Sequence, residues 1–159
     1  MLSFLRFLML LALVVWLGGI IFFSFGVAPV LFKVLPTRHL AGSVVTRSLA
    51  TLHAMGIISG VIFLLSSMTH AHLTRSSAEP LAARHVLVYA MILLTLVSQS
   101  SISPKMAALR ADMVEIDTIA ATDPRRIEFN RLHQWSTRLE GGVLLLGLAV
   151  AYLVARRLS

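Results

Sequence analysis

The sequence predicts an all-α integral membrane four-helix bundle whose third and fourth helices extend beyond the bilayer as a hairpin. Three observations support this fold class. Of the 159 residues, 57% are hydrophobic and only 13% are charged, whereas soluble domains carry about 25% charged residues. Four apolar stretches are each long enough to cross a bilayer, which takes about 20 residues. The 14 basic and 7 acidic residues lie at the ends of these stretches or between them.

The net charge of +7 does not indicate nucleic-acid binding. The basic residues flank apolar helices, where they normally meet anionic lipid head groups, and no basic helix face is interleaved with aromatic residues. The expected partners are therefore membrane lipids, together with other membrane-protein subunits or a second copy of the chain. The sequence contains no cysteine, which excludes disulfides, thiolate metal sites and CxxCH haem attachment.

The first predicted span covers about residues 7–32. The apolar run is longer than the core of a signal peptide, which has about 7–15 residues, and a proline follows the nearest small-residue site. We therefore predict an uncleaved helix. Pro29, near its end, should kink or terminate it.

The second and third spans are predicted at about residues 48–69 and 83–103. The segment 33–47 before them is basic and contains Pro36 and Gly42, which predicts a connection. The third helix should begin near residue 79, and Pro104 should bend it.

Residues 105–138 are predicted to form an amphipathic hairpin, with a helix over 105–121. Its apolar residues recur at spacings of three and four, with charges between them; they are Met106, Leu109, Met113, Ile116 and Ala120. Thr122 or Asp123 should cap the last helix, with Pro124 at its first position. That helix should run from about 124 to 157, with the fourth span at about 139–156.

Four spans place both termini on the same side of the membrane. Nine basic residues lie on the side of the first and third loops: Lys33, Arg38, Arg47, Lys105, Arg110, Arg125, Arg126, Arg131 and Arg138. Five lie on the other side: Arg6, Arg75, Arg84, Arg156 and Arg157. The charge density is similar on both sides, so the positive-inside rule gives only a small preference for cytoplasmic first and third loops.

Small residues at helical spacing predict helix packing, because they let backbones approach closely in lipid. Gly56 and Gly60 form a GxxxG pair. Gly147, Ala151 and Ala155 form a ladder of small residues on the last helix, and Gly18 and Gly19 are predicted to pack in the same way.

His53 shares a helix face with Gly56 and Gly60, three and seven residues further along. An ionisable residue that faces the interior of a membrane bundle suggests a functional site. The alternative is a neutral histidine that forms a hydrogen bond with a neighbouring carbonyl or serine.

A polar stripe precedes the last apolar run. It consists of Asn130, His133, Ser136, Thr137 and Glu140. The stripe could orient a ring nitrogen, bind a cation or relay protons; alternatively, its members are solvated above the hydrocarbon. Glu140 adjoins the apolar sequence and needs a partner on another helix, or water, because Arg138 points to a different face.

Histidines on two helices also admit haem b, which His53 and His133 could ligate if they lay at the same depth. Haem is possible but not favoured. A metal site at His70, His72 and His85 is a weaker alternative, because the two side chains of an HxH diverge on a helix. The sequence has no phosphate loop, no GxSxG or HExxH motif and no paired carboxylates on a common helix face. An enzyme is therefore not the favoured interpretation.

Three stretches together resemble the small four-helix family that includes transmembrane protein 205. They are VWLGGIIFFSFGVAPVLF at 15–32, LPTRHLAGSVV at 35–45 and FNRLHQWSTRLEGG at 129–142. The matching residues are Trp16, Gly18, Gly19, Pro29, Phe32, Pro36, Gly42, His133 and Ser136. The resemblance implies a four-span membrane protein and supplies no reaction. It also implies an asparagine seven residues after the histidine, where this chain has Glu140.

A more remote likeness links the first span to protoporphyrinogen oxidases and copper-resistance D-type membrane domains, which keeps haem and copper as alternatives. We predict a membrane protein of unknown activity that acts as an accessory or interaction subunit of a membrane complex. The first alternative is a haem- or metal-binding protein that uses His53 and His133. The second is a carrier of a small solute or metal ion, with His133 and Glu140 as ligands.

Overall fold

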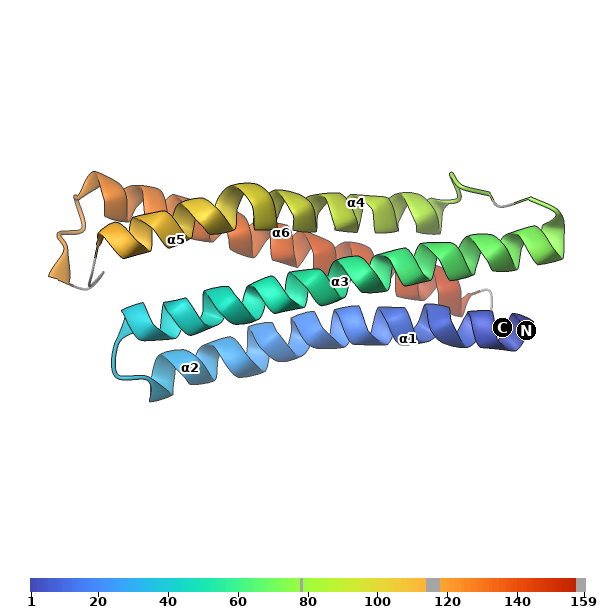
Figure 1. The fold of residues 1–159 in the computed structure, drawn as a ribbon, viewed down its shortest axis with the longest axis horizontal. Coiled ribbons are helices and arrows are strands. Elements are labelled where there is room, and N and C mark those ends of the chain that lie inside the picture. The colour runs from blue at the N-terminus through green and yellow to red at the C-terminus, as the bar shows by residue number, and fades with distance from the viewer. Residues whose placement is uncertain (78, 114–117, 157–159) are drawn as a thin grey trace.

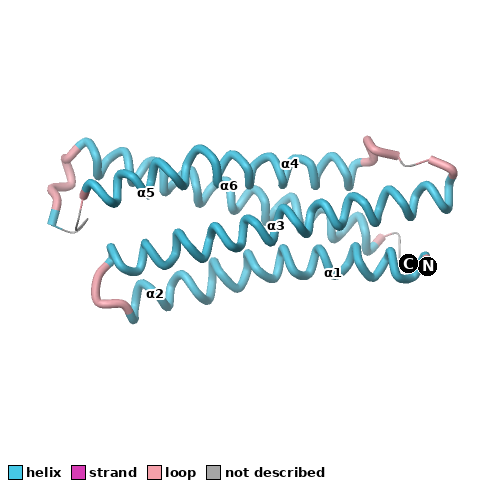
Figure 2. Tube along the Cα trace, viewed as in Figure 1, coloured by secondary structure: helices cyan, strands magenta, loops and turns pink. Residues whose placement is uncertain are grey.

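The computed structural model describes residues 1–77, 79–113 and 118–156, and these form helices joined by turns (Figures 1 and 2). Four helical rods are long and apolar enough to cross a membrane. They cover Leu2–Val34, Arg38–Arg75, Ala83–Asp112 and Pro124–Ala155. The predicted all-α, four-helix membrane fold is therefore confirmed.

The rods run antiparallel to their chain neighbours in one elongated bundle (Figure 1). The first rod consists of α1 (Leu2–Ile21), the π-helix η1 (Phe22–Val27) and α2 (Ala28–Val34), and the second is α3 (Arg38–Arg75). The third consists of α4 (Ala83–Val97), the π-helix η2 (Ser98–Ile102) and α5 (Ser103–Asp112), and the fourth is α6 (Pro124–Ala155). The main contacts pair α1 with α3 and α4 with α6, and contacts of α3 with α4 and α1 with α6 close the ring.

The interior and the exterior of the bundle are both apolar. Trp16, Phe63 and Met91 are buried in the central core. Phe22, Phe25 and many other large apolar side chains remain exposed on the outer faces. An outer surface of this kind suits contact with lipid, because a soluble monomer rarely exposes large continuous apolar patches.

Pro29 and Pro104 do not end their helices, because each follows a wider π turn. Proline lacks an N–H and its ring clashes with the carbonyl four residues earlier. The N–H of Ala28 donates to the carbonyl of Phe23, and that of Ser103 donates to the carbonyl of Ser98, so both bonds span five residues. The wider turn gives the proline ring room, and the first helix continues to Val34.

The predicted connection over 33–47 is wrong, because α3 already begins at Arg38. The first rod ends where Leu35 adopts an extended conformation before Pro36. The Thr37 side chain then caps α3 by accepting the N–H of Leu40 at 3.1 Å. Gly42 lies inside α3, where it is required for a tertiary contact and not for a turn.

The third and fourth rods form the expected hairpin, which reaches beyond the α2–α3 turn at the same end of the bundle (Figure 1). Its first helix is shorter than predicted, since α5 ends at Asp112 and not near residue 121. Met106 and Met113 are buried as the periodicity predicts, Ala120 is exposed, and Ile116 lies outside the described residues. The last helix begins at Pro124, as predicted.

The third helix begins at Ala83, four residues later than predicted. Glu79 has a φ of 44°, in the left-handed region, which is incompatible with the start of a right-handed helix.

Candidate functional site

His53, Gln99 and Glu140 form a hydrogen-bonded centre inside the bundle, which we call the polar centre. Nδ1 of His53 lies 2.8 Å from Oε1 of Gln99, and Nε2 lies 3.2 Å from Oε2 of Glu140. His53 is 2% exposed, and the Glu140 side chain is 14% exposed. The three side chains come from α3, η2 and α6, so the centre joins three of the four rods.

Each side chain is placed by the helix that carries it. His53 lies on the buried face of α3, which it shares with Gly56 and Gly60 as the spacing predicts. Gln99 lies in the π turn that precedes Pro104, and such turns are frequent at functional sites. Glu140 lies in α6 one turn before Val143, where the buried apolar face of that helix resumes.

The proton count of the polar centre follows from the orientation assigned to the Gln99 amide. With the amide of Gln99 assigned so that Oε1 faces the ring, Nδ1 of His53 donates the hydrogen bond. The contact between Nε2 and the Glu140 carboxyl then requires one further proton, carried by either the imidazole or the carboxyl. In this orientation of the Gln99 amide, the centre holds one ionisable proton between α3 and α6.

Only one member of the predicted polar stripe reaches this centre. Asn130, His133 and Thr137 are exposed, and Ser136 is half-buried. The hydroxyl of Thr137 donates to the carbonyl of His133 at 3.0 Å, within the helix. The stripe is thus a surface feature of α6 up to Glu140, which alone turns inward.

His53 and His133 are not brought together. His133 precedes Glu140 by seven residues, which corresponds to about 10.5 Å along a helix. Both ring nitrogens of His53 are already engaged, by Gln99 and Glu140. The geometry therefore gives no support to a haem held by these two imidazoles.

Comparison with protein families gives one match. Residues 11–115 match the model of a family described as a domain of unknown function (DUF4149). The chain belongs to this family. The matched region contains His53 and Gln99 and ends before Glu140. Comparisons with curated proteins and with solved structures gave no significant match.

Sequence reasoning missed Gln99, whose partner is a histidine 46 residues earlier. A signal existed in SQSS at 98–101, a run of four polar residues at the end of an apolar span. Assigning that run to the end of the third span, where Pro104 should bend the helix, concealed it. The structure places it inside a continuous helical rod, where Ser98 is 1% exposed.

The three histidines considered as a metal site have other roles. Nε of Arg6 donates to Nε2 of His70 at 3.1 Å, and His72 is exposed. The ring of the fully buried His85 bonds to the hydroxyl of Ser67 and the carbonyl of Glu79, each at 2.8 Å. Within residues 1–77, 79–113 and 118–156, no three His, Cys, Asp or Glu side chains are grouped so that they could hold a metal ion.

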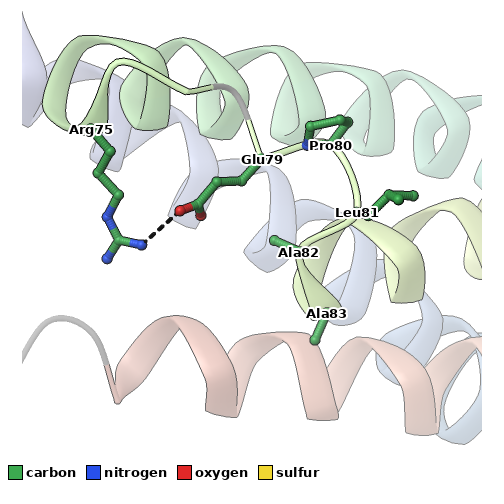
Figure 3. Close-up of a pocket in the computed structure, with 6 residues that line it drawn as sticks. All are labelled: Arg75, Glu79, Pro80, Leu81, Ala82 and Ala83. Carbon is green, nitrogen blue, oxygen red and sulfur yellow. Dashed lines mark hydrogen bonds and ion pairs between the residues drawn. The ribbon is translucent and has the colours of Figure 1, made fainter.

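A shallow pocket lies at the α3–α4 turn, and Figure 3 shows its lining. Arg75 forms an ion pair with Glu79 across it, at 3.0 Å. Close by, Nε of Arg84 donates to the hydroxyl of Ser67 at 2.7 Å. These bonds tie the end of α3 to the start of α4, so we assign the cluster to the closure of the turn.

The small residues pack against side chains from other helices. Gly56 and Gly60 both lie under the indole of Trp16, Gly19 lies against Leu52, and Gly147 lies against Leu17. The GxxxG pair of α3 therefore accommodates an aromatic ring and not the backbone of another helix.

Gly18 and Ala151 line a surface groove between α1 and α6. A Cβ at Gly18 would meet nothing within 4 Å, so this glycine has no packing role within the described chain. Ala151 also contacts the central core.

Proposed function

We propose that the protein is a proton-linked membrane protein in which His53 and Glu140 form the proton-binding pair. The single observation that carries this proposal is the contact of 3.2 Å between Nε2 and Oε2, inside a bundle with an apolar exterior. Ionisable residues within membrane segments commonly mark ion pathways and proton relays. A carrier of a small solute or ion is the function class that such a pair serves best.

Loss of the proton acts directly on the arrangement of the helices. While Nδ1 of His53 donates to Gln99, loss of this proton leaves the lone pair of Nε2 facing a carboxylate oxygen, and the interaction becomes repulsive. The pair joins α3 to α6, so deprotonation favours separation of these two helices. Proton binding is thereby coupled to a change in the bundle, as a proton-linked carrier requires.

The decisive experiment measures the helix distance and the proton together. The chain has no cysteine, so Ala54→Cys and Gly141→Cys place spin labels at two exposed positions beside the pair. We expect the α3–α6 distance, measured by double electron–electron resonance in liposomes, to increase as the pH rises. Infrared titration follows protonation of the carboxyl in the same sample.

Glu140→Gln is the matched control, because its amide N–H can donate to the neutral imidazole of His53 without a titratable proton. Its α3–α6 distance should not change with pH. A pH-dependent distance in this variant, or a constant distance in the parent chain between about pH 5 and pH 8, would remove the proposal.

The accessory-subunit function is a second proposal. It is supported by the groove between α1 and α6, where small residues at Gly18, Ala151 and Ala155 leave space for another helix. Native mass spectrometry in mild detergent tests whether a second subunit binds there. Gly18→Leu should abolish the assembly, and a monomer in every detergent would contradict this function.

We also propose kinship with the family of transmembrane protein 205, for which the three resembling stretches are the support. That kinship implies an amide in place of Glu140. Glu140→Asn should then fold and keep a hydrogen bond to His53, while it loses the pH response expected of the parent chain.

A further inference from the structure

Arg110 is a buried cation whose contacts include no acidic side chain in the described ranges. It lies in α5 and is 7% exposed. Its Nη1 donates to the hydroxyl of Thr46 at 2.7 Å, and its guanidinium carbon lies 5.3 Å from the centroid of the Phe129 ring. Its Nε is buried and has no acceptor among the residues that the structure describes.

Gly42 leaves the space that the guanidinium occupies. A Cβ at this position of α3 would lie 3.0–3.1 Å from Nη2, Cζ and Nε of Arg110. Such distances are tighter than most real contacts, so a side chain at residue 42 would displace the guanidinium. Arg110 therefore sits in a cradle between α3 and α6.

The buried charge of Arg110 is only partly compensated by the described residues around it. Burial of a charge without a counter-charge is strongly unfavourable, and a hydroxyl together with an aromatic face compensates only part of it. Guanidinium groups bind phosphate and carboxylate through charge-assisted hydrogen bonds, which are stronger than neutral ones. The component that the described residues do not supply is thus an anion with oxygen acceptors.

The position of the cradle indicates which anions can reach it. It lies in the α5–α6 hairpin, at the end of the bundle that also carries the α2–α3 turn (Figure 1). Juxtamembrane cations at such positions meet the phosphates of anionic lipids. His133 follows Phe129 by one helical turn, so it lies on the face of α6 that contacts Arg110 through the Phe129 ring.

We propose that Arg110, flanked by Thr46 and His133, binds a phosphate group at the α3–α5–α6 interface. The group belongs to an anionic phospholipid or is a free phosphate anion. The guanidinium supplies the charge and the forked donors, Thr46 holds it in position, and His133 forms the outer edge of the site.

Lipid binding to the purified protein tests this site. Native mass spectrometry compares retention of phosphatidylglycerol with that of phosphatidylcholine, and inorganic phosphate is added as a competitor. We expect Arg110→Gln to lower the affinity for phosphatidylglycerol at least about tenfold, because the variant loses one or two charge-assisted hydrogen bonds. If phosphate displaces phosphatidylglycerol, the site binds the free anion. If phosphate does not displace it, the bound phosphate group is that of the lipid head group.

Arg131→Gln is the matched control, because Arg131 is an exposed arginine of α6 that pairs with Glu128 at 2.8 Å. It removes the same formal charge from the same end of the bundle, and it should change the affinity less than about twofold. If both variants lose the same affinity for phosphatidylglycerol, the effect is one of general surface charge and the proposed site is wrong.

Thermal unfolding of the parent chain keeps the proposal testable if Arg110→Gln fails to fold. A ligand that binds only the folded state raises the melting temperature. Phosphatidylglycerol or phosphate should raise it more in the parent chain than in Thr46→Val. If the parent chain melts at the same temperature with phosphatidylglycerol, with phosphate and with phosphatidylcholine alone, the proposal is overturned.

Discussion

The contact between His53 and Glu140 ties α3 to α6, and its strength follows from burial. Removal of one partner of a buried charged pair typically costs about 3–5 kcal/mol, whereas ordinary interhelical hydrogen bonds in membranes average about 0.6 kcal/mol. The Glu140 side chain is 14% exposed, so Glu140→Leu should lower the free energy of unfolding by about 3 kcal/mol. Denaturant unfolding in mixed micelles measures this loss.

The double variant His53→Leu/Glu140→Leu completes the thermodynamic cycle. It removes both polar groups, so it should lose less stability than the sum of the two single variants. Glu140→Gln retains a hydrogen bond and should lie within about 1 kcal/mol of the parent chain. Additive losses, within about 0.5 kcal/mol, would mean that the two side chains do not interact.

Two glycines of the bundle should respond in opposite ways to the same substitution. A Cβ at Gly60 would lie 2.8 Å from the Trp16 ring and 2.9 Å from Ile92, whereas a Cβ at Gly141 would meet nothing within 4 Å. Gly60→Ala should destabilise the protein by about 1–3 kcal/mol through overpacking. Gly141→Ala should leave it unchanged or stabilise it by up to about 1 kcal/mol through helix propensity.

Thermal unfolding in one detergent compares the two variants side by side. Equal stability of Gly60→Ala and Gly141→Ala would show that the indole of Trp16 can move away from α3 without loss. The assignment of the GxxxG pair to an aromatic contact would then be wrong.

At the level of a whole helix, the start of α6 depends on one carboxylate. Asp123 accepts the side-chain and backbone N–H groups of Arg125, and these bonds lower the pKa of its carboxyl from 3.8 to about 2. A lowered folded-state pKa means that the cap stabilises the helix above about pH 4, and that this contribution is lost as the pH falls towards 2. Hydrogen exchange of the first amides of α6 should therefore accelerate over this range.

Asp123→Asn is the control for this prediction. Asparagine caps helices about as well as aspartate, but it has no carboxyl to titrate. Exchange in this variant should show no added acceleration between about pH 4 and pH 2. The same acceleration in both proteins would assign the effect to another group.

The two π turns show where local sequence rules stop being sufficient. Asp123 and Pro124 were predictable as a helix start because capping depends only on neighbouring residues. Pro29 was expected to kink or terminate its helix and Pro104 to bend its helix, yet each helical rod continues past its proline after a π turn. The N–H groups of Ala28 and Ser103 each bond to a carbonyl five residues earlier, and the spacing of residues along the chain does not reveal such a bond.

The architecture of the whole molecule was more predictable than its polar centre. Composition and span length determine a four-helix membrane bundle, because lipid leaves few ways to satisfy the backbone. The functional interest of His53 and Glu140 also followed from their apolar surroundings. Their mutual contact did not, since it depends on how α3 and α6 are rotated about their axes. Gly42 was misassigned for the same reason, because its partner Arg110 lies in another helix.

The membrane topology of the bundle can be tested because the chain contains no cysteine. Ser77 and Thr122 are exposed in turns at opposite ends of the bundle, and Ser3 is exposed near the start of α1. If all four rods cross the bilayer, an impermeant maleimide applied to intact cells should label Ser77→Cys and Ser3→Cys but not Thr122→Cys. This direction follows from the excess of basic residues on the side of the first and third loops.

Labelling of Thr122→Cys alone would reverse the orientation and keep the four spans. Labelling of both Ser77→Cys and Thr122→Cys in intact cells would mean that the one rod between them, Ala83–Asp112, does not cross the bilayer, which contradicts the four-span topology.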